Sequence, residues 1–169
     1  MKNLVVYYSW TGSTRAVAQA VSAAVEGELV EITEVKRRSG IWGFITGGFQ
    51  ASMGKASRIR ETLPDPAGYD AIYIGTPVWA AKPSAAFNAA IQAWAGKTAD
   101  VPVHVFTLMA DPNGNPMVET AVRKRLEGAG MRTGTYASFT GKKPNQEWPG
   151  EAKDTARAAA GKWAGETIR

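Results

Sequence analysis

The 169 residues are 44% hydrophobic and 21% charged, which is typical of one globular domain and unlike a disordered, fibrous or membrane-spanning chain. The chain has no cysteine, which excludes disulfides, thiolate metal sites and cysteine nucleophiles. The net charge of +5 comes from scattered lysines and arginines, so it predicts solvated faces or a docking surface for an acidic partner or anionic substrate, and no nucleic-acid partner.

The first apolar run, residues 4–8, is rich in β-formers and ends at polar Ser9. It is too short for the apolar core of a secretory signal, so we expect a cytoplasmic protein. The run predicts a buried strand that ends at about Ser9.

The segment that follows predicts a helix from Ser13 to about Gly27, because Val17, Val21 and Val25 recur on one face. Residues 29–35 alternate apolar and polar side chains, which predicts a strand near a sheet edge. The remaining apolar patterns predict strands at 69–77, 101–109 and 131–139, and helices at 83–96, 117–128 and 151–169.

Strands that alternate with helices indicate an α/β fold, with a parallel sheet and helices on both faces. No linker interrupts the pattern, so we expect a single domain over residues 1–169. Right-handed crossovers restrict the topology to doubly wound orders.

A loop rich in hydroxyl side chains follows the first strand and consists of Ser9, Trp10, Thr11, Gly12, Ser13 and Thr14. Hydroxyls and backbone N–H groups at the positive end of a helix dipole suit a phosphate dianion. The loop has neither the Gly-Lys-Ser/Thr ending of a nucleoside-triphosphate site nor the GxGxxG pattern of a dinucleotide site. The same hydroxyls would also serve as a simple helix cap.

This loop resembles the phosphate loop of the flavodoxins, a Ser/Thr-x-Thr-Gly-x-Thr pattern after the first strand. Residues 75–79, Gly-Thr-Pro-Val-Trp, resemble the second flavin loop of the same family. The resemblance covers essentially the whole chain. It implies a flavodoxin-like sheet of five parallel strands in the order 2-1-3-4-5, with flavin mononucleotide (FMN) bound noncovalently at the carboxyl ends of strands one, three and four.

The resemblance also implies which residues contact FMN. The phosphate would be held by Ser9, Thr11, Ser13 and Thr14 together with the amides of Gly12 and its neighbours. Trp10 belongs to the same loop, where contact with a partner and simple packing are both open. The ring would be lined by Thr76, Pro77, Val78, Trp79, Ala80 and Ala81, with Trp79 stacked on it or buried in the core. A third loop, 108–114, would meet the pyrimidine edge through Leu108, Met109, Asp111 and Gly114.

Two residues depart from the family pattern. In many flavodoxins a glycine follows the second-loop aromatic, and its peptide turns toward the one-electron-reduced ring, whereas Ala80 stands here. The positive φ that such a turn needs is costly for alanine. Lys82 lies beside this loop in a basic chain, although flavodoxins are usually acidic, and its charge would stabilise an anionic reduced ring.

The segment 36–63 is too long for a compact crossover and predicts an irregular helix near 41–53. Its aromatic residues Trp42, Phe44 and Phe49 would form local packing, a cover for the flavin or a homodimer surface. His104 lies between two valines of an expected strand, where a buried, hydrogen-bonded histidine is a better interpretation than a catalytic base.

Other functions of this architecture fit less well. A response regulator needs carboxylates where Ser9 and Thr76 stand, and a low-molecular-weight tyrosine phosphatase needs a cysteine. A binding module without a cofactor remains open. We expect an FMN electron-transfer protein, or alternatively an FMN-dependent NAD(P)H or quinone reductase, with no metal site and no catalytic side chain of its own. Its partner would be a redox protein or a small-molecule electron donor or acceptor.

Overall fold

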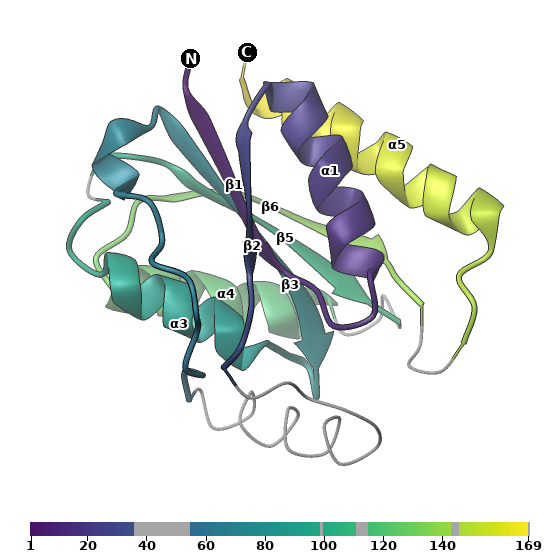
Figure 1. Ribbon diagram of the computed structural model, residues 1–169, viewed down its shortest axis with the longest axis horizontal. Helices are drawn as coiled ribbons and strands as arrows, with labels where there is room; N and C mark the ends of the chain where they lie inside the picture. Colours follow the sequence, from purple (N-terminus) through teal and green to yellow (C-terminus); the bar gives the residue numbers. More distant parts are fainter. Residues whose placement is uncertain (36–54, 99, 111–114, 143–145, 169) are drawn as a thin grey trace.

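The computed structural model describes residues 1–35, 55–98, 100–110, 115–142 and 146–168 (Figure 1). Its sheet is built on five parallel strands in the order β2-β1-β3-β5-β6. These strands are β1 (Asn3–Tyr8), β2 (Glu28–Ile32), β3 (Ala71–Trp79), β5 (Val103–Met109) and β6 (Thr133–Thr140). The predicted α/β class and strand order are confirmed.

Helices cover both faces of this sheet (Figure 1). On one face lie α1 (Ser13–Val25) and α5 (Gly150–Thr167), and on the other lie α3 (Ala85–Trp94) and α4 (Asn115–Gly128). Successive side chains of a strand point to opposite faces. Val5 therefore packs with α1 and α5, whereas Leu4 and Val6 pack in the core beneath α3 and α4.

Burial separates the central strands from the edge strand β2. Every residue of β1 is buried, whereas Glu28 and Leu29 of β2 are exposed. Because β2 pairs only with β1 among the described strands, it forms an edge of the sheet, as its alternating pattern predicts.

A short hairpin extends the third strand beyond the expected boundary. The two-residue strand β4 (Lys82–Pro83) pairs antiparallel with the end of β3, with Trp79 opposite Lys82. The expected strand end at residue 77 and helix start at residue 83 were therefore wrong by two residues each. The turn consists of Ala80 and Ala81, whose φ angles are +48° and +55°. Two-residue hairpin turns with both central residues at positive φ normally carry Asn or Gly.

The chain returns from the long excursion beside the continuation of β2. Glu34 forms an isolated antiparallel bridge with Ile59, and the Val35 amide donates to the Arg58 carbonyl at 2.9 Å. The helix expected near 41–53, with Trp42, Phe44 and Phe49, lies outside the described residues. Within the described ranges, no helix combines the length and the apolar character needed to span a bilayer.

Candidate functional site

Strand register brings the predicted loops to one edge of the sheet. Tyr7 of β1 is paired with Gly75 of β3, and Pro77 of β3 is paired with Leu108 of β5. Because these strands are parallel, the loops after β1, β3 and β5 all leave at the same carboxyl edge. Two expected residues of the third loop, Asp111 and Gly114, lie outside the described residues.

The loop between β1 and α1 has a fixed shape. The Gly12 amide donates to Ser9 Oγ at 3.1 Å, and the Gly12 carbonyl accepts from the Ala16 amide at 3.1 Å. Gly12 is the N-cap of α1 and has φ +91°, a left-handed conformation that favours glycine. Because the N-cap residue is a glycine, it has no side chain that could cap the first turn of α1.

Ser13 is the first residue of α1, and its hydroxyl is buried without a hydrogen-bond partner. The residue is 5% exposed, and the following Thr14 is also buried. A buried hydroxyl without a partner costs about 1–3 kcal/mol. An anion at this uncapped helix end would accept from the Ser13 hydroxyl and benefit from the helix dipole. The structure therefore provides a site whose donors suit a phosphate group.

Residues from another strand enclose this loop. Gly141 follows β6, and a Cβ atom on it would lie 3.5 Å from the Ser13 Cβ and 3.4 Å from the Leu108 Cβ. The end of β6 therefore packs against both the first loop and the end of β5. Leu108 and Met109 are both buried, and they pack in the cores on opposite faces of the sheet.

Three aromatic rings pack together where β1 and β3 end, one from each strand and one from the loop between β1 and α1. The Trp79 ring meets the Tyr8 ring edge to face, with centroids 5.9 Å apart, and it meets the Trp10 ring in the same way at 5.8 Å. Trp79 is only 5% exposed and belongs to the core cluster, whereas Trp10 is partly exposed and packs against that cluster.

A buried carboxylate supports this aromatic group and is absent from the predicted site. The Tyr8 hydroxyl donates to Glu34 Oε2 at 2.9 Å, and Glu34 is 7% exposed. The alternating pattern of residues 29–35 indicates this burial, because Glu34 is two positions after buried Ile32 and therefore points to the same face.

The second loop divides into a buried part and an exposed part. Thr76 is fully buried, and its Oγ1 accepts from the Ser84 amide at 3.1 Å. Its side chain therefore holds the start of α3. Pro77, Val78, Ala81 and Lys82 are partly exposed, and Ala80 is exposed.

His104 lies near the amino end of β5, away from these loops. Its Nδ1 accepts from the Thr135 amide at 3.1 Å, and its ring stacks on Tyr73 with centroids 4.8 Å apart. Burial, and next the charge of Arg132, lower the pKa of His104 below 6.5. The predicted buried, hydrogen-bonded histidine is confirmed. No cluster of metal-ligating side chains occurs within the described part of the chain.

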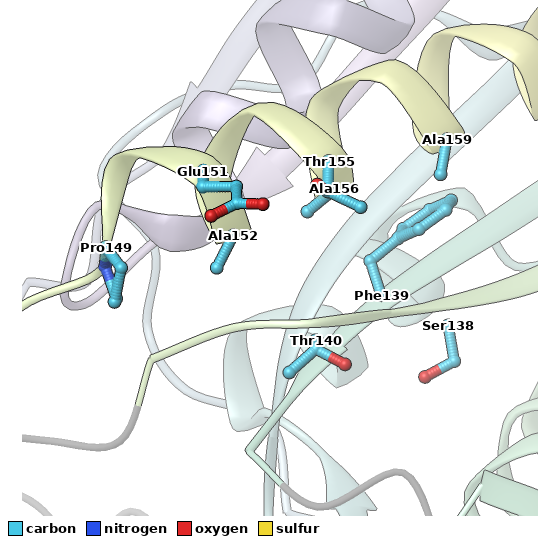
Figure 2. Close-up of a pocket in the computed structure, with 9 residues that line it drawn as sticks. All are labelled: Ser138, Phe139, Thr140, Pro149, Glu151, Ala152, Thr155, Ala156 and Ala159. Carbon is cyan, nitrogen blue, oxygen red and sulfur yellow. The ribbon is translucent and has the colours of Figure 1, made fainter.

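A separate pocket of about 480 Å³ lies between the end of β6 and the first turns of α5. Figure 2 shows Phe139 and the alanines of α5 on its walls, with Glu151 near the start of the helix. It shares no residue with the candidate site. Its lining residues are Ser138, Phe139, Thr140, Pro149, Glu151, Ala152, Thr155, Ala156 and Ala159.

The chain matches no protein-family model and no curated protein. Solved structures do share its architecture. It is similar to a flavoprotein in complex with FMN from Lactobacillus acidophilus (TM-score 0.71, 22% identity, 81% of this chain and 92% of that chain). It is also similar to oxidised flavodoxin 1 from Bacillus cereus (TM-score 0.58, 12% identity, 99% and 97%) and to the azoreductase AzrA (TM-score 0.59, 15% identity, 98% and 100%). The fold is flavodoxin-like.

The flavodoxin-like fold has a fixed place for ligands, the crevice outside the carboxyl ends of the strands where the strand order reverses. In this chain the order reverses between β1 and β3. The unpartnered Ser13 hydroxyl and the partly exposed Trp10 both follow β1, and the β3–β4 hairpin follows β3. The candidate residues therefore lie at the carboxyl edge of the sheet, beside the reversal of the strand order.

Proposed function

We propose that the chain binds FMN noncovalently at this edge and functions as an electron-transfer flavoprotein. The observation that carries the proposal is the buried, unpartnered Ser13 hydroxyl at the uncapped start of α1. When bound, FMN supplies the redox chemistry, and the protein determines its orientation, electrostatics and access.

The phosphate end of the site follows from the loop between β1 and α1. Ser13 and Thr11 donate hydroxyl hydrogen bonds to the phosphate, together with backbone amides of the first turn of α1. Ser9 also shapes the loop, because its hydroxyl accepts from the Gly12 amide, and the same hydroxyl keeps its hydrogen for donation to the phosphate. Hydrogen bonds to a charged group are worth about 1.5–3 kcal/mol each, which is enough to bind a dianion without a lysine.

The ring end of the site follows from the exposed surface of the second loop. Pro77, Val78 and Ala81 offer apolar contact to a planar ring, and Thr76 fixes the loop from inside. Lys82 lies next to this surface and is partly exposed. Its positive charge stabilises negative charge on the reduced ring and favours reduction.

The position of Lys82 also favours a second candidate, an FMN-dependent NAD(P)H or quinone reductase. A basic residue beside the ring suits an anionic small-molecule substrate, and the azoreductase AzrA shares the fold. In the electron-transfer function the partner is a redox protein, whereas in the reductase function it is a small-molecule electron donor or acceptor.

Two measurements on the purified protein test these proposals. The flavin released by denaturation is identified by chromatography and mass, and we expect FMN. Tightly bound FAD or riboflavin, or no flavin after reconstitution, would contradict the phosphate site. Anaerobic reduction followed by visible absorbance then separates the two functions. Rapid reduction by NADH or NADPH alone identifies a reductase, and reduction only by a redox protein or dithionite supports the electron-transfer protein.

A further inference from the structure

The two tryptophans of the candidate site differ in their access to a ligand. Trp79 is 5% exposed, and its ring meets the Tyr8 and Trp10 rings edge to face. A flavin ring could stack on Trp79 only after neighbouring side chains were displaced. Trp10 is partly exposed and packs against the core cluster that contains Trp79.

The hairpin after β3 holds Trp79 in this buried place. Trp79 is the last residue of β3 and is paired with Lys82 across the two-residue turn. The turn keeps two alanines at positive φ, a conformation that is sterically unfavourable for L-residues and favours glycine. Such strain persists only where the surrounding packing determines the conformation. Burial of the Trp79 indole against Tyr8 is packing of this kind.

The loop between β1 and α1 holds the backbone of Trp10 in place. Its neighbour Ser9 accepts a hydrogen bond from the Gly12 amide, which closes the turn that carries Trp10. The Trp10 and Trp79 rings lie at 88° to each other with centroids 5.8 Å apart, so Trp79 supports the Trp10 indole through an edge-to-face contact. An indole fixed in this way loses little conformational entropy when a planar ligand packs on it.

We infer that Trp10, and not Trp79, is the aromatic side chain that packs on the isoalloxazine ring. Trp79 and Tyr8 are positioning residues that support the Trp10 indole, and the Glu34 carboxylate fixes Tyr8 through its hydroxyl. The inference rests on the proposed function, because it names the ring contact of the same FMN site. It replaces the ring contact that the family resemblance implies for Trp79.

The experiment measures the dissociation constants of FMN and riboflavin, because riboflavin has the same ring and no phosphate. Loss of a ring contact weakens both ligands by the same factor. We expect Trp10→Ala to raise both constants by roughly tenfold, and Trp10→Phe to restore most of the affinity. The visible circular dichroism of bound FMN should change in the Trp10 variants, because it reports the asymmetry around the ring.

Two further variants act as controls. Trp94→Phe removes an indole from the core beneath α3, where its Nε1 donates to the Pro64 carbonyl at 2.9 Å, and it should leave both constants unchanged. Trp79→Phe keeps an aromatic support under Trp10 and should weaken both ligands less than Trp10→Ala does.

The outcomes separate this inference from the proposed function. If the wild-type protein binds no FMN, the proposed function fails and the inference fails with it. If FMN binds but Trp10→Ala changes both constants by less than twofold, the inference alone is overturned. A larger loss of affinity in Trp79→Phe than in Trp10→Ala overturns it as well.

Discussion

Thr76 and Ser84 are joined across the β3–β4 hairpin at the place where the sheet passes into α3. Thr76 Oγ1 accepts from the Ser84 amide at 3.1 Å and lies 3.0 Å from the Ser84 hydroxyl oxygen. The Ser84 hydroxyl in turn accepts from the Phe87 amide at 3.3 Å and so caps α3. Both residues are fully buried. One threonine therefore connects the second loop of the site to the start of a helix.

We predict that Thr76→Val lowers the free energy of unfolding by about 1–3 kcal/mol, because the buried Ser84 amide loses its acceptor. Thr76→Ser keeps the hydroxyl and should retain most of the stability. Denaturation by urea, followed by circular dichroism, measures both variants. Equal stability of Thr76→Val and the wild type would show that the hydrogen bond to Ser84 contributes nothing.

Gly75 precedes this threonine at a point where β3 approaches its neighbour closely. A Cβ atom on Gly75 would overlap the ring of Phe106 and lie 3.0 Å from the Tyr7 Cβ. We predict that Gly75→Ala destabilises the fold by about 1–3 kcal/mol through overpacking. Gly68→Ala is the matched control, because nothing lies within 4 Å of its added Cβ. A comparable loss in both variants would contradict the packing argument.

A glycine in the turn at Ala80 and Ala81 should stabilise the fold, whereas the two substitutions above destabilise it. Glycine adopts positive φ without steric cost, so Ala81→Gly should raise the free energy of unfolding by about 1 kcal/mol. Ala158→Gly, at an exposed position within α5, should lower it by about 1 kcal/mol. Thermal and urea unfolding of the two variants test the contrast. Destabilisation by Ala81→Gly would show that the turn is not strained.

Protonation of His104 should couple stability to pH. Burial lowers the pKa of His104 in the folded state, so the unfolded chain binds the proton more readily. The contribution of the neutral imidazole is therefore complete above the ordinary pKa of 6.5 and is lost as the pH falls below it. Unfolding curves measured between about pH 7.5 and about pH 5.5, roughly one unit on either side of that value, should show this loss. His104→Gln, which cannot titrate, should have a smaller slope over the same interval.

The sheet and the first loop were predictable because their signals are local. Buried strands appear as short apolar runs, and the hydroxyl-rich loop follows the first of them directly. The sequence did not predict the hairpin after β3, because its turn consists of Ala80 and Ala81 and contains no glycine, asparagine or proline. The residue type of Ser84 does indicate the start of α3, because serine is a preferred N-cap before an apolar helical pattern.

Side-chain contacts between distant segments were not predictable in this way. The Thr76 hydroxyl binds Ser84 only because the hairpin folds back, and the Tyr8 hydroxyl reaches Glu34 across 26 positions of the chain. The burial of Trp79 depends on Tyr8 at the end of β1 and on Trp10 in the loop that follows it. A sequence pattern shows that an aromatic residue ends a strand, but neighbours from elsewhere determine which of its faces remains accessible.

The affinity of the Ser13→Ala variant for FMN and riboflavin tests the phosphate site most directly. Removing a hydrogen bond to a charged group should raise the FMN dissociation constant by at least about tenfold, and the riboflavin constant should stay the same. The melting temperature of the protein without flavin should not fall, because the substitution removes a buried hydroxyl that has no partner. An unchanged FMN constant together with a lower melting temperature would show that Ser13 serves the fold and binds no phosphate.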